Sequence, residues 1–395
     1  MHRPVAAATC VGLAAAALLM AGCARPEQAK GPGVVFYPPP PDPPRLQFLM
    51  NITSADPWIT RRSSFADFIV GSRREGEDTG AIKSPYGVAA HDGKIYICDL
   101  GRFLVHVIDM VNRKYATLGE SGQLQKPVNI AIEPDGTKYV CDAAKRMVAV
   151  FDAGDRLVRF LGDPGRCGPM AVAVLGDELF VADAPGGKVE VWDRQGNLKR
   201  VIGSLGDGPD QFRRPVGIAI GPQGHVFVTD QELSVIKEFE PGGRYVKSIG
   251  APGDRPGFFA RPKGIAFDPK GRLFVADAQW DKVQVFDASG QLLLFFGEST
   301  GQPHGLVTPT GVAIDATSME AFRKYVDPGF EPEYLLLVSN QFGVNKIVVH
   351  AFGHAKGAAE PPAAPPAAEK PPVAAPAAEK APVAAPAGAR AADGL

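Results

Sequence analysis

Short runs of alternating apolar and polar residues recur along the chain, and residues 261–298 show the pattern most regularly. Val283 and Val285 alternate with Gln284, which is the period of a β-strand rather than of a helix. Four such runs are separated by turn sequences. One turn, residues 268–271, has proline second and glycine fourth, which suits a type I turn. The segment therefore predicts one four-stranded antiparallel meander, about the size of a propeller blade.

The meander repeats along the chain, and each copy opens with a proline. The spacings between these prolines are 42, 42, 46, 47 and 47 residues, close to the period of propeller repeats. The prolines are Pro85, Pro127, Pro169, Pro215, Pro262 and Pro309. The second predicted strand of each copy ends in an acidic or amide residue: Asp99, Asp142, Asp183, Asp230, Asp277 and Asn340. We therefore predict an all-β fold, a six-bladed β-propeller of four-stranded antiparallel blades.

The sixth copy lacks a fourth strand of its own. Its predicted third strand, residues 346–352, is followed by Gly353 and then by low-complexity sequence. Residues 45–52 read RLQFLMNI, with apolar side chains on one face, so they predict an N-terminal strand. Because unpaired sheet edges promote aggregation, we expect this strand to pair with residues 346–352 and close the ring. The same copy carries an insertion, residues 316–333, with a predicted helical turn at residues 318–325.

Both termini differ in composition from the repeats. Residues 1–22 predict a lipoprotein signal peptide, because a basic start precedes an apolar run too short to span a bilayer. The run ends in LMAGC, which resembles the lipobox of bacterial lipoproteins and implies lipidation of Cys23; the alanine that follows implies the outer membrane. Residues 23–44 predict a proline-rich tether, and residues 45–353 the propeller. Residues 354–395, rich in Ala, Pro, Glu and Lys, predict a disordered tail.

Composition excludes several classes of partner. The formal net charge is −1, with 42 basic against 43 acidic residues, so we expect no nucleic-acid partner and no attraction to an anionic membrane surface. Cys98 and Cys141 occupy equivalent positions in adjacent blades, too far apart for a disulfide, and are expected to be free. Cys167 lies in a loop and is a candidate free thiol. No Cys-x-x-Cys-His motif occurs, so we expect no covalent haem and no other cofactor.

The repeat pattern Pro-x-Gly-Ile-Ala, Gly-x-Leu-Phe-Val-Ala-Asp and Val-x-Val-Phe resembles the NHL repeat family of β-propellers. Residues 261–298 match best and residues 214–250 match well, and the likeness extends from 45 to 353. PPRLQFL at the start and the insertion in the last blade resemble the six-bladed NHL lipoproteins of bacteria rich in multihaem cytochromes. The resemblance implies a non-catalytic interaction surface in the cell envelope, with a multihaem cytochrome of an electron-transfer assembly as partner.

Two enzyme classes remain as alternatives. Some NHL propellers resemble peptidyl-hydroxyglycine lyases, which hold zinc through about three converging histidines; His91, His106, His225, His304, His350 and His354 are predicted to lie apart. Calcium-dependent lactonase propellers need convergent acidic and amide groups on the innermost strands, where Asn129 is the one obvious amide. The recurrent acidic residues are better explained as strand-end corners that accept backbone hydrogen bonds. We therefore expect no catalytic residue and no metal ligand.

One departure from neutrality suggests an interaction surface. Basic residues gather just before and after the prolines that open the blades: Lys83, Lys126, Arg166, Arg213, Arg214, Arg261 and Lys263. We expect them at one end of the central channel, where low-dielectric walls strengthen their attraction for an anion or an acidic partner. The alternative is that they are solvated loop residues paired with nearby carboxylates. The other irregular segments, residues 53–84 and the insertion at 316–333, are further candidate binding regions.

Overall fold

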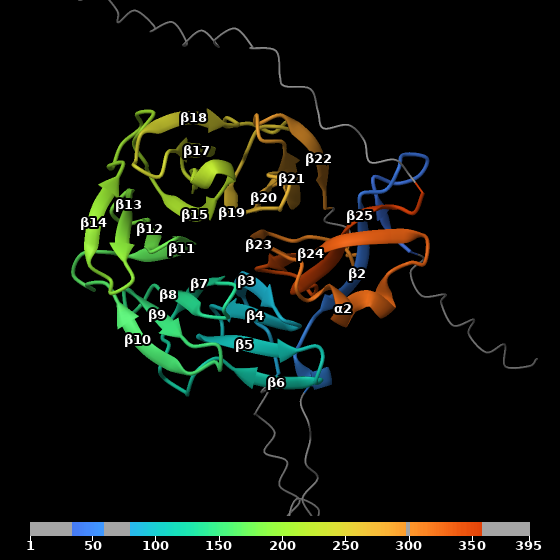
Figure 1. Cartoon of the computed structure of the whole chain (residues 1–395). Coiled ribbons are helices and arrows are strands. Elements are labelled where there is room, and N and C mark those ends of the chain that lie inside the picture. The colour runs from blue at the N-terminus through green and yellow to red at the C-terminus, as the bar shows by residue number, and fades with distance from the viewer. Residues whose placement is uncertain (1–33, 59–79, 298–300, 358–395) are drawn as a thin grey trace, which may run out of the picture. The chain divides into compact units, whose positions relative to one another are not determined.

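The computed structural model describes residues 34–58, 80–297 and 301–357, and these residues form a ring of six antiparallel sheets (Figure 1). The predicted all-β, six-bladed propeller is confirmed. The predicted signal peptide, Cys23 and the tail beyond residue 357 lie outside the described residues, as does most of the excursion at 53–84. No helix in the described part of the chain is long and apolar enough to cross a membrane.

Five blades are each built from four strands that follow one another in the sequence, and the sixth combines β23, β24 and β25 with strands from the N-terminus. In every blade the first strand after the opening proline lies nearest the ring axis. The innermost strands are β3 (Pro85–His91), β7 (Pro127–Ile132), β11 (Pro169–Leu175), β15 (Pro215–Ile220), β19 (Pro262–Phe267) and β23 (Pro309–Asp315). The second strands are β4 (Lys94–Asp99), β8 (Lys138–Asp142), β12 (Glu178–Asp183), β16 (Val226–Asp230), β20 (Leu273–Asp277) and β24 (Phe330–Asn340). The third strands are β5 (Leu104–Asp109), β9 (Met147–Phe151), β13 (Lys188–Asp193), β17 (Val235–Phe239), β21 (Lys282–Phe286) and β25 (Ile347–Ala355). The outer strands are β6 (Lys114–Thr117), β10 (Leu157–Leu161), β14 (Leu198–Ile202), β18 (Tyr245–Ile249), β22 (Leu292–Phe296) and β2 (Leu46–Ile52).

The N-terminal strand closes the ring as predicted. β2 pairs antiparallel with β25, with Leu46 opposite Phe352 and Ile52 opposite Ile347. A further two-residue strand, β1 (Phe36–Tyr37), pairs with the start of β2, so the sixth blade has five strands. Part of the predicted tether is therefore strand. The reason is apolar burial, because the Phe36 ring packs 5.6 Å from that of Phe330.

The sixth blade also extends beyond the predicted end of the propeller at residue 353. β25 continues to Ala355, which pairs with Phe330 of β24. The insertion lengthens β24, and the longer strand gives the end of β25 a partner. The predicted helical turn is present as α2 (Met319–Phe322) and the 3-10 helix η3 (Arg323–Tyr325).

Strand periodicity sorts apolar side chains into clusters between neighbouring blades. On β20, Phe274 and Ala276 face the sixth blade, whereas Leu273 and Val275 face the fourth. Because both faces of an inner strand are covered, these strands are nearly continuous in apolar residues. Packing between blades, rather than a single central core, therefore holds the ring together.

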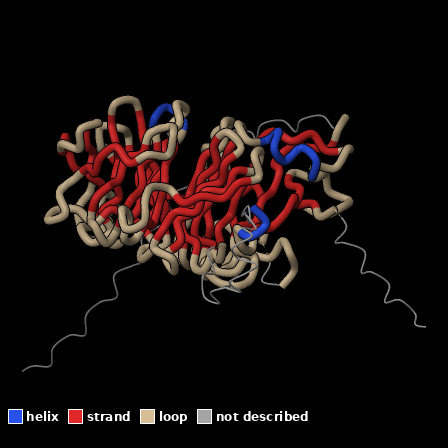
Figure 2. The backbone as a smooth tube through the Cα atoms, turned by 90° about the horizontal axis from the view of Figure 1, so that it is seen from below, coloured by secondary structure: helices blue, strands red, loops and turns tan. Residues whose placement is uncertain are grey.

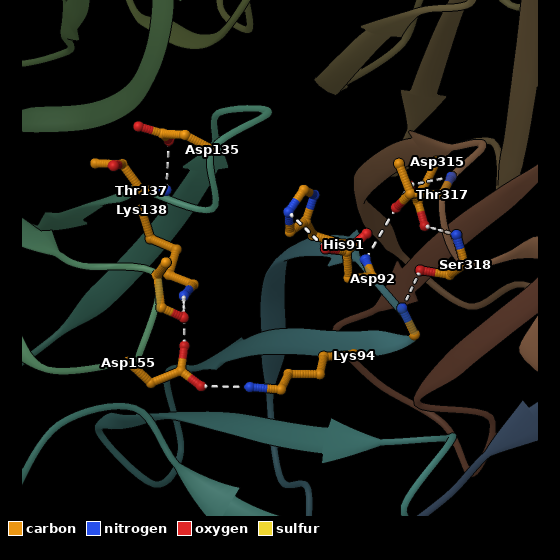
Figure 3. Close-up of polar contacts among 12 residues, drawn as sticks. His91, Asp92, Lys94, Asp135, Thr137, Lys138, Asp155, Asp315, Thr317 and Ser318 are labelled. Carbon is orange, nitrogen blue, oxygen red and sulfur yellow. Dashed lines mark hydrogen bonds and ion pairs between the residues drawn. The ribbon is translucent and has the colours of Figure 1, made fainter.

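Loops lie at the two faces of the ring, with the strands between them (Figure 2). We call the face where the chain enters each innermost strand the entry face. At the opposite face, polar contacts join neighbouring blades, as Figure 3 shows. Asp155 of the second blade accepts a hydrogen bond from Lys94 of the first blade at 2.9 Å and pairs with the buried Lys138 of its own blade at 2.6 Å. Thr317 and Ser318 of the insertion accept hydrogen bonds from the turn between β3 and β4. The insertion thus links the last blade to the first.

Candidate functional site: the axial cluster on the entry face

The acidic or amide residue at the end of each second strand is buried at the entry face and holds the entering loop. Asp230 accepts hydrogen bonds from the backbone N–H groups of Arg213 and Arg214 in that loop, and of Glu232 and Leu233 in the next turn. Equivalent contacts occur at Asp99, Asp142, Asp183 and Asp277. Recurrence of one set of contacts around the ring is what a framework role requires.

A second recurrent position also anchors the entering loops, and sequence reasoning missed it. It lies seven residues after the corner residue, on the third strand, and holds a buried polar side chain in four blades: His106, Glu190, Lys237 and Gln284. Gln284 accepts from the N–H of Gly257 and donates to the carbonyl of Phe258. Lys237 donates to the carbonyl of Gly208. The signal in the sequence is a polar residue at a fixed offset within an otherwise apolar strand.

Lys263 is the predicted site residue whose surroundings are least explained by framework contacts. It is the second residue of β19 and is 4% exposed. Its Nζ lies 5.1 Å from the centre of the Tyr86 ring in β3 and donates to Oε1 of Gln341 at 3.2 Å. β19 and β3 belong to the fifth and first blades, which lie on either side of the sixth blade. The contact between Lys263 and Tyr86 therefore spans the inner end of the sixth blade, near the ring axis.

Two nearby arginines repel the positive charge of Lys263. Burial, followed by the guanidinium groups of Arg261 and Arg214, lowers the pKa of Lys263 to about 8. Within the described chain, no carboxylate pairs with Lys263. Arg261 donates to the amide oxygen of Gln231 at 2.7 Å, in the amide orientation that hydrogen bonding favours. We call Tyr86, Arg214, Arg261, Lys263 and Gln341 the axial cluster.

The other predicted basic residues are placed differently. Arg213 pairs with Asp207 in its own loop, and Arg166 pairs with Glu190 at 3.2 Å. Arg214 has a carboxylate partner and also belongs to the axial cluster. Its Nη1 lies 3.8 Å from Glu232, and its charge still lowers the pKa of Lys263. Lys83 and Lys126 are exposed, and their backbone N–H groups donate to corner carboxylates. All seven basic residues therefore lie at the entry face, but only Arg214, Arg261 and Lys263 belong to the axial cluster.

Within the described residues the histidines occupy different parts of the ring, except that His304 and His350 lie close to each other. His106 contacts Asp99 at 3.1 Å inside the first blade, and His225 contacts Glu238 at 2.6 Å in the fourth. His304 and His350 both lie beside the ring of Phe48, at centroid distances of 5.8 and 6.0 Å. Burial lowers the pKa of His350 to about 3, so this imidazole is neutral at physiological pH.

One buried group combines a thiol with two carboxylates. Ligand atoms of Cys167, Asp183 and Glu190 lie within 4.8 Å of one another. Lys188 Nζ lies 2.9 Å from Glu190 and 3.8 Å from Asp183, and Arg166 also reaches Glu190. Burial raises the pKa of the Cys167 thiol, so the thiol is protonated. Cations of the chain itself thus neutralise these carboxylates. Cys98, Cys141 and Cys167 are free and buried, as predicted for the first two.

We predict that Lys263 makes the stability of the protein depend on pH. The folded pKa of Lys263, about 8, lies below its ordinary value of 10.5. Between these pH values the unfolded chain binds more protons, so the free energy of unfolding rises with pH. The loss of stability caused by burying the charged form of Lys263 is fully present below pH 8 and is on the order of 3 kcal/mol. Lys263→Met is expected to remove this rise, which denaturant unfolding between pH 7 and 10 measures. An equal pH dependence in both proteins would contradict the burial of a charged Lys263.

Comparison with known proteins shows the fold and no family. No family model matches the chain, and no curated protein sequence matches it. A protein of unknown function from Bacteroides thetaiotaomicron is 15% identical with a TM-score of 0.54, covering 78% of this chain and 75% of that one. A gluconolactonase from Xanthomonas campestris is 16% identical with a TM-score of 0.53, covering 79% and 90%. Virginiamycin B lyase from Staphylococcus aureus is 15% identical with a TM-score of 0.48, covering 69% and 96%. The chain thus shares its fold with a gluconolactonase and with a protein of unknown function.

Proposed function

We propose that the protein is a non-catalytic scaffold, anchored through Cys23 to the outer membrane of a bacterial cell, that docks an acidic partner protein at the axial cluster. The observation that carries the proposal is Lys263. A buried ammonium beside two guanidinium groups is unfavourable unless an anion is supplied from outside. A carboxylate of a partner would pair with three cations at once, in a partly desolvated position where such pairing is strong.

The sequence resemblance supports the identity of that partner. It implies a multihaem cytochrome of an extracytoplasmic electron-transfer assembly, and in this role the propeller holds the cytochrome at the membrane without binding a cofactor itself. The recurrent corner residues support a non-catalytic role, because they are occupied by backbone contacts in blade after blade.

Charge reversal at the axial cluster tests the proposal. The double variant Arg214→Glu, Arg261→Glu is expected to reduce partner capture from solubilised outer membranes by at least tenfold, because both changes turn attraction into repulsion. The matched control is Arg156→Glu, an exposed arginine that pairs with Asp152 at the opposite face. An unchanged set of captured proteins in the double variant would contradict docking at this face.

The competing function is a metal-dependent hydrolase or lyase that acts at the entry face. It rests on the likeness to a gluconolactonase, which is a likeness of fold at 16% identity. Metal analysis of the protein after chelator washing and reloading with zinc or calcium separates the two functions. Stoichiometric metal would favour the enzyme, whereas a small fraction of one ion per chain would favour the scaffold.

A further inference from the structure

A groove of about 230 Å³ lies at the outer rim between the sixth and the first blade. It is lined by the outer strand β2 and the segment that follows it, by the turn between β5 and β6, and by the insertion. Its described lining consists of Met50, Asn51, Ile52, Thr53, Ser54, Pro57, Trp58, Met110, Arg113, Lys324 and Tyr325. It is separate from the axial cluster, with which it shares no residue.

Segments that depart from the repeat supply most of this lining. Trp58 ends the 3-10 helix η1 (Asp56–Trp58), which follows the ring-closing strand. Lys324 and Tyr325 belong to the insertion of the sixth blade. Two irregular segments, far apart in the sequence, therefore meet at one groove, whereas the framework contributes the end of β2 and the turn between β5 and β6. Framework packing alone does not require this convergence.

The wall made by the insertion is fixed to β2. The side-chain amide of Gln47 donates to the carbonyl of Tyr325 at 3.0 Å, and its oxygen accepts from the N–H of Asp327 at 3.0 Å. Gln47 is 2% exposed, so this pair of hydrogen bonds is shielded from water. These hydrogen bonds hold the part of the insertion that lines the groove in place against β2.

Part of the edge of β2 along the groove has no strand partner in the described chain. β1 pairs with β2 at Leu46 and Gln47, and in the described chain no strand pairs with the same edge further along, up to Ile52. Met50, Asn51 and Ile52 of this uncovered part line the groove. β1 itself demonstrates that the edge accepts an added strand. An exposed edge beside an apolar groove is the arrangement that proteins use to bind extended peptides.

The side chains of the groove define the chemistry of its occupant. Met50, Ile52, Trp58, Met110 and Tyr325 give it an apolar lining. The charged groups of the described lining are two exposed cations, Arg113 and Lys324, and none of its side chains is acidic. Lys324 Nζ lies 5.0 Å from the centre of the Tyr325 ring, which keeps the charge at the rim. The groove therefore favours an occupant that combines apolar with negatively charged side chains.

We propose that this groove is a peptide-docking site. An extended segment of a partner protein pairs with β2 beyond β1, places an apolar side chain against Met50 and Trp58, and places acidic side chains beside Arg113 and Lys324. This site goes beyond the proposed docking at the axial cluster, and each stands or falls separately.

The test uses the full-length protein and an eight-residue capped peptide that alternates valine with glutamate. We expect fluorescence anisotropy to show saturable binding, and hydrogen exchange to show new protection of those backbone amides of Leu49–Ile52 that do not already bond to β25. The double variant Arg113→Glu, Lys324→Glu is expected to weaken binding about tenfold or more. Lys114→Glu, on an exposed residue adjacent to Arg113 and outside the lining, is the matched control and is expected to bind as the wild type does.

Several outcomes would overturn the proposal. A peptide with lysine in place of glutamate that binds equally well would remove the role of the two cations. Binding without protection of Leu49–Ile52 would remove the strand pairing. Protection in the free protein of the Leu49–Ile52 amides that do not bond to β25 would mean that the edge is already covered by the chain itself. Unchanged binding by Arg214→Glu, Arg261→Glu is expected here, and this separates the groove from the axial cluster.

Discussion

Asp230→Ala is expected to lower the free energy of unfolding by about 3–5 kcal/mol, one of the two largest effects that we predict for a single side chain. The Asp230 carboxylate is fully buried and accepts four backbone N–H groups. Alanine leaves these donors without an acceptor inside the protein. Each unsatisfied buried donor costs about 1–3 kcal/mol, and entry of water recovers part of that loss.

Denaturant unfolding of the purified variant measures this effect. The matched control is Asp135→Ala, at the opposite face, where an exposed carboxylate accepts a hydrogen bond from the N–H of Thr137. The control is expected to lose less than about 1 kcal/mol, because water replaces an exposed partner. Equal losses in the two variants would show that the corner residues do not hold the framework.

The sixth blade shows why an amide serves at one corner. Asn340 accepts the N–H of Val307 through Oδ1 and donates through Nδ2 to the carbonyl of Asn345. Asp230 faces donors on both oxygens, so Asp230→Asn would turn an acceptor into a donor that meets Arg213 N–H. The acidic residues at the other corners and the asparagine here therefore follow from the local partners of each loop.

Local features of the fold were predictable from the sequence, because they depend on spacing along the chain. The period of two, the proline at the start of each blade and the missing last strand were sufficient to predict that β2 closes the ring. β1 was missed because Phe36 and Tyr37 lie among prolines, and two residues are too few to show a period. The end of β25 at Ala355 was missed because it depends on the longer partner strand β24.

The candidate site was less predictable, because it depends on contacts between blades. The sequence analysis grouped seven basic residues because they lie close to the prolines that open the blades. In the structure, however, Arg166 and Arg213 form ion pairs with carboxylates in or near their own loops. Lys263 differs because Tyr86, 177 positions earlier in the chain, lies beneath its ammonium. The groove at the rim was similarly hidden, although both irregular segments that line it were recognised as departures from the repeat.

Gly311→Ala is expected to destabilise the protein by about 3 kcal/mol or more, because it forces apart the innermost strands where the ring closes. A Cβ atom at Gly311 would lie 2.5 Å from the carbonyl oxygen of Tyr86 and 2.7 Å from Oγ of Ser339. The first contact is with backbone, which cannot rotate away. Neighbouring strands approach as closely at Gly87, Gly217 and Gly264.

The closing contact also carries side-chain hydrogen bonds that the variant would disturb. Thr310 Oγ1 lies 3.1 Å from the carbonyl oxygen of Tyr86, and Ser339 Oγ bonds the same oxygen. Gly242→Ala is the matched control, since a Cβ there meets no atom within 4 Å. Thermal and denaturant unfolding are expected to show a large loss for Gly311→Ala and almost none for Gly242→Ala. Glycine-to-alanine replacement by itself lowers the entropy of the unfolded chain and stabilises the fold. A loss of similar size in both variants would therefore mean that the close approach of β23 to β3 does not set the requirement for glycine.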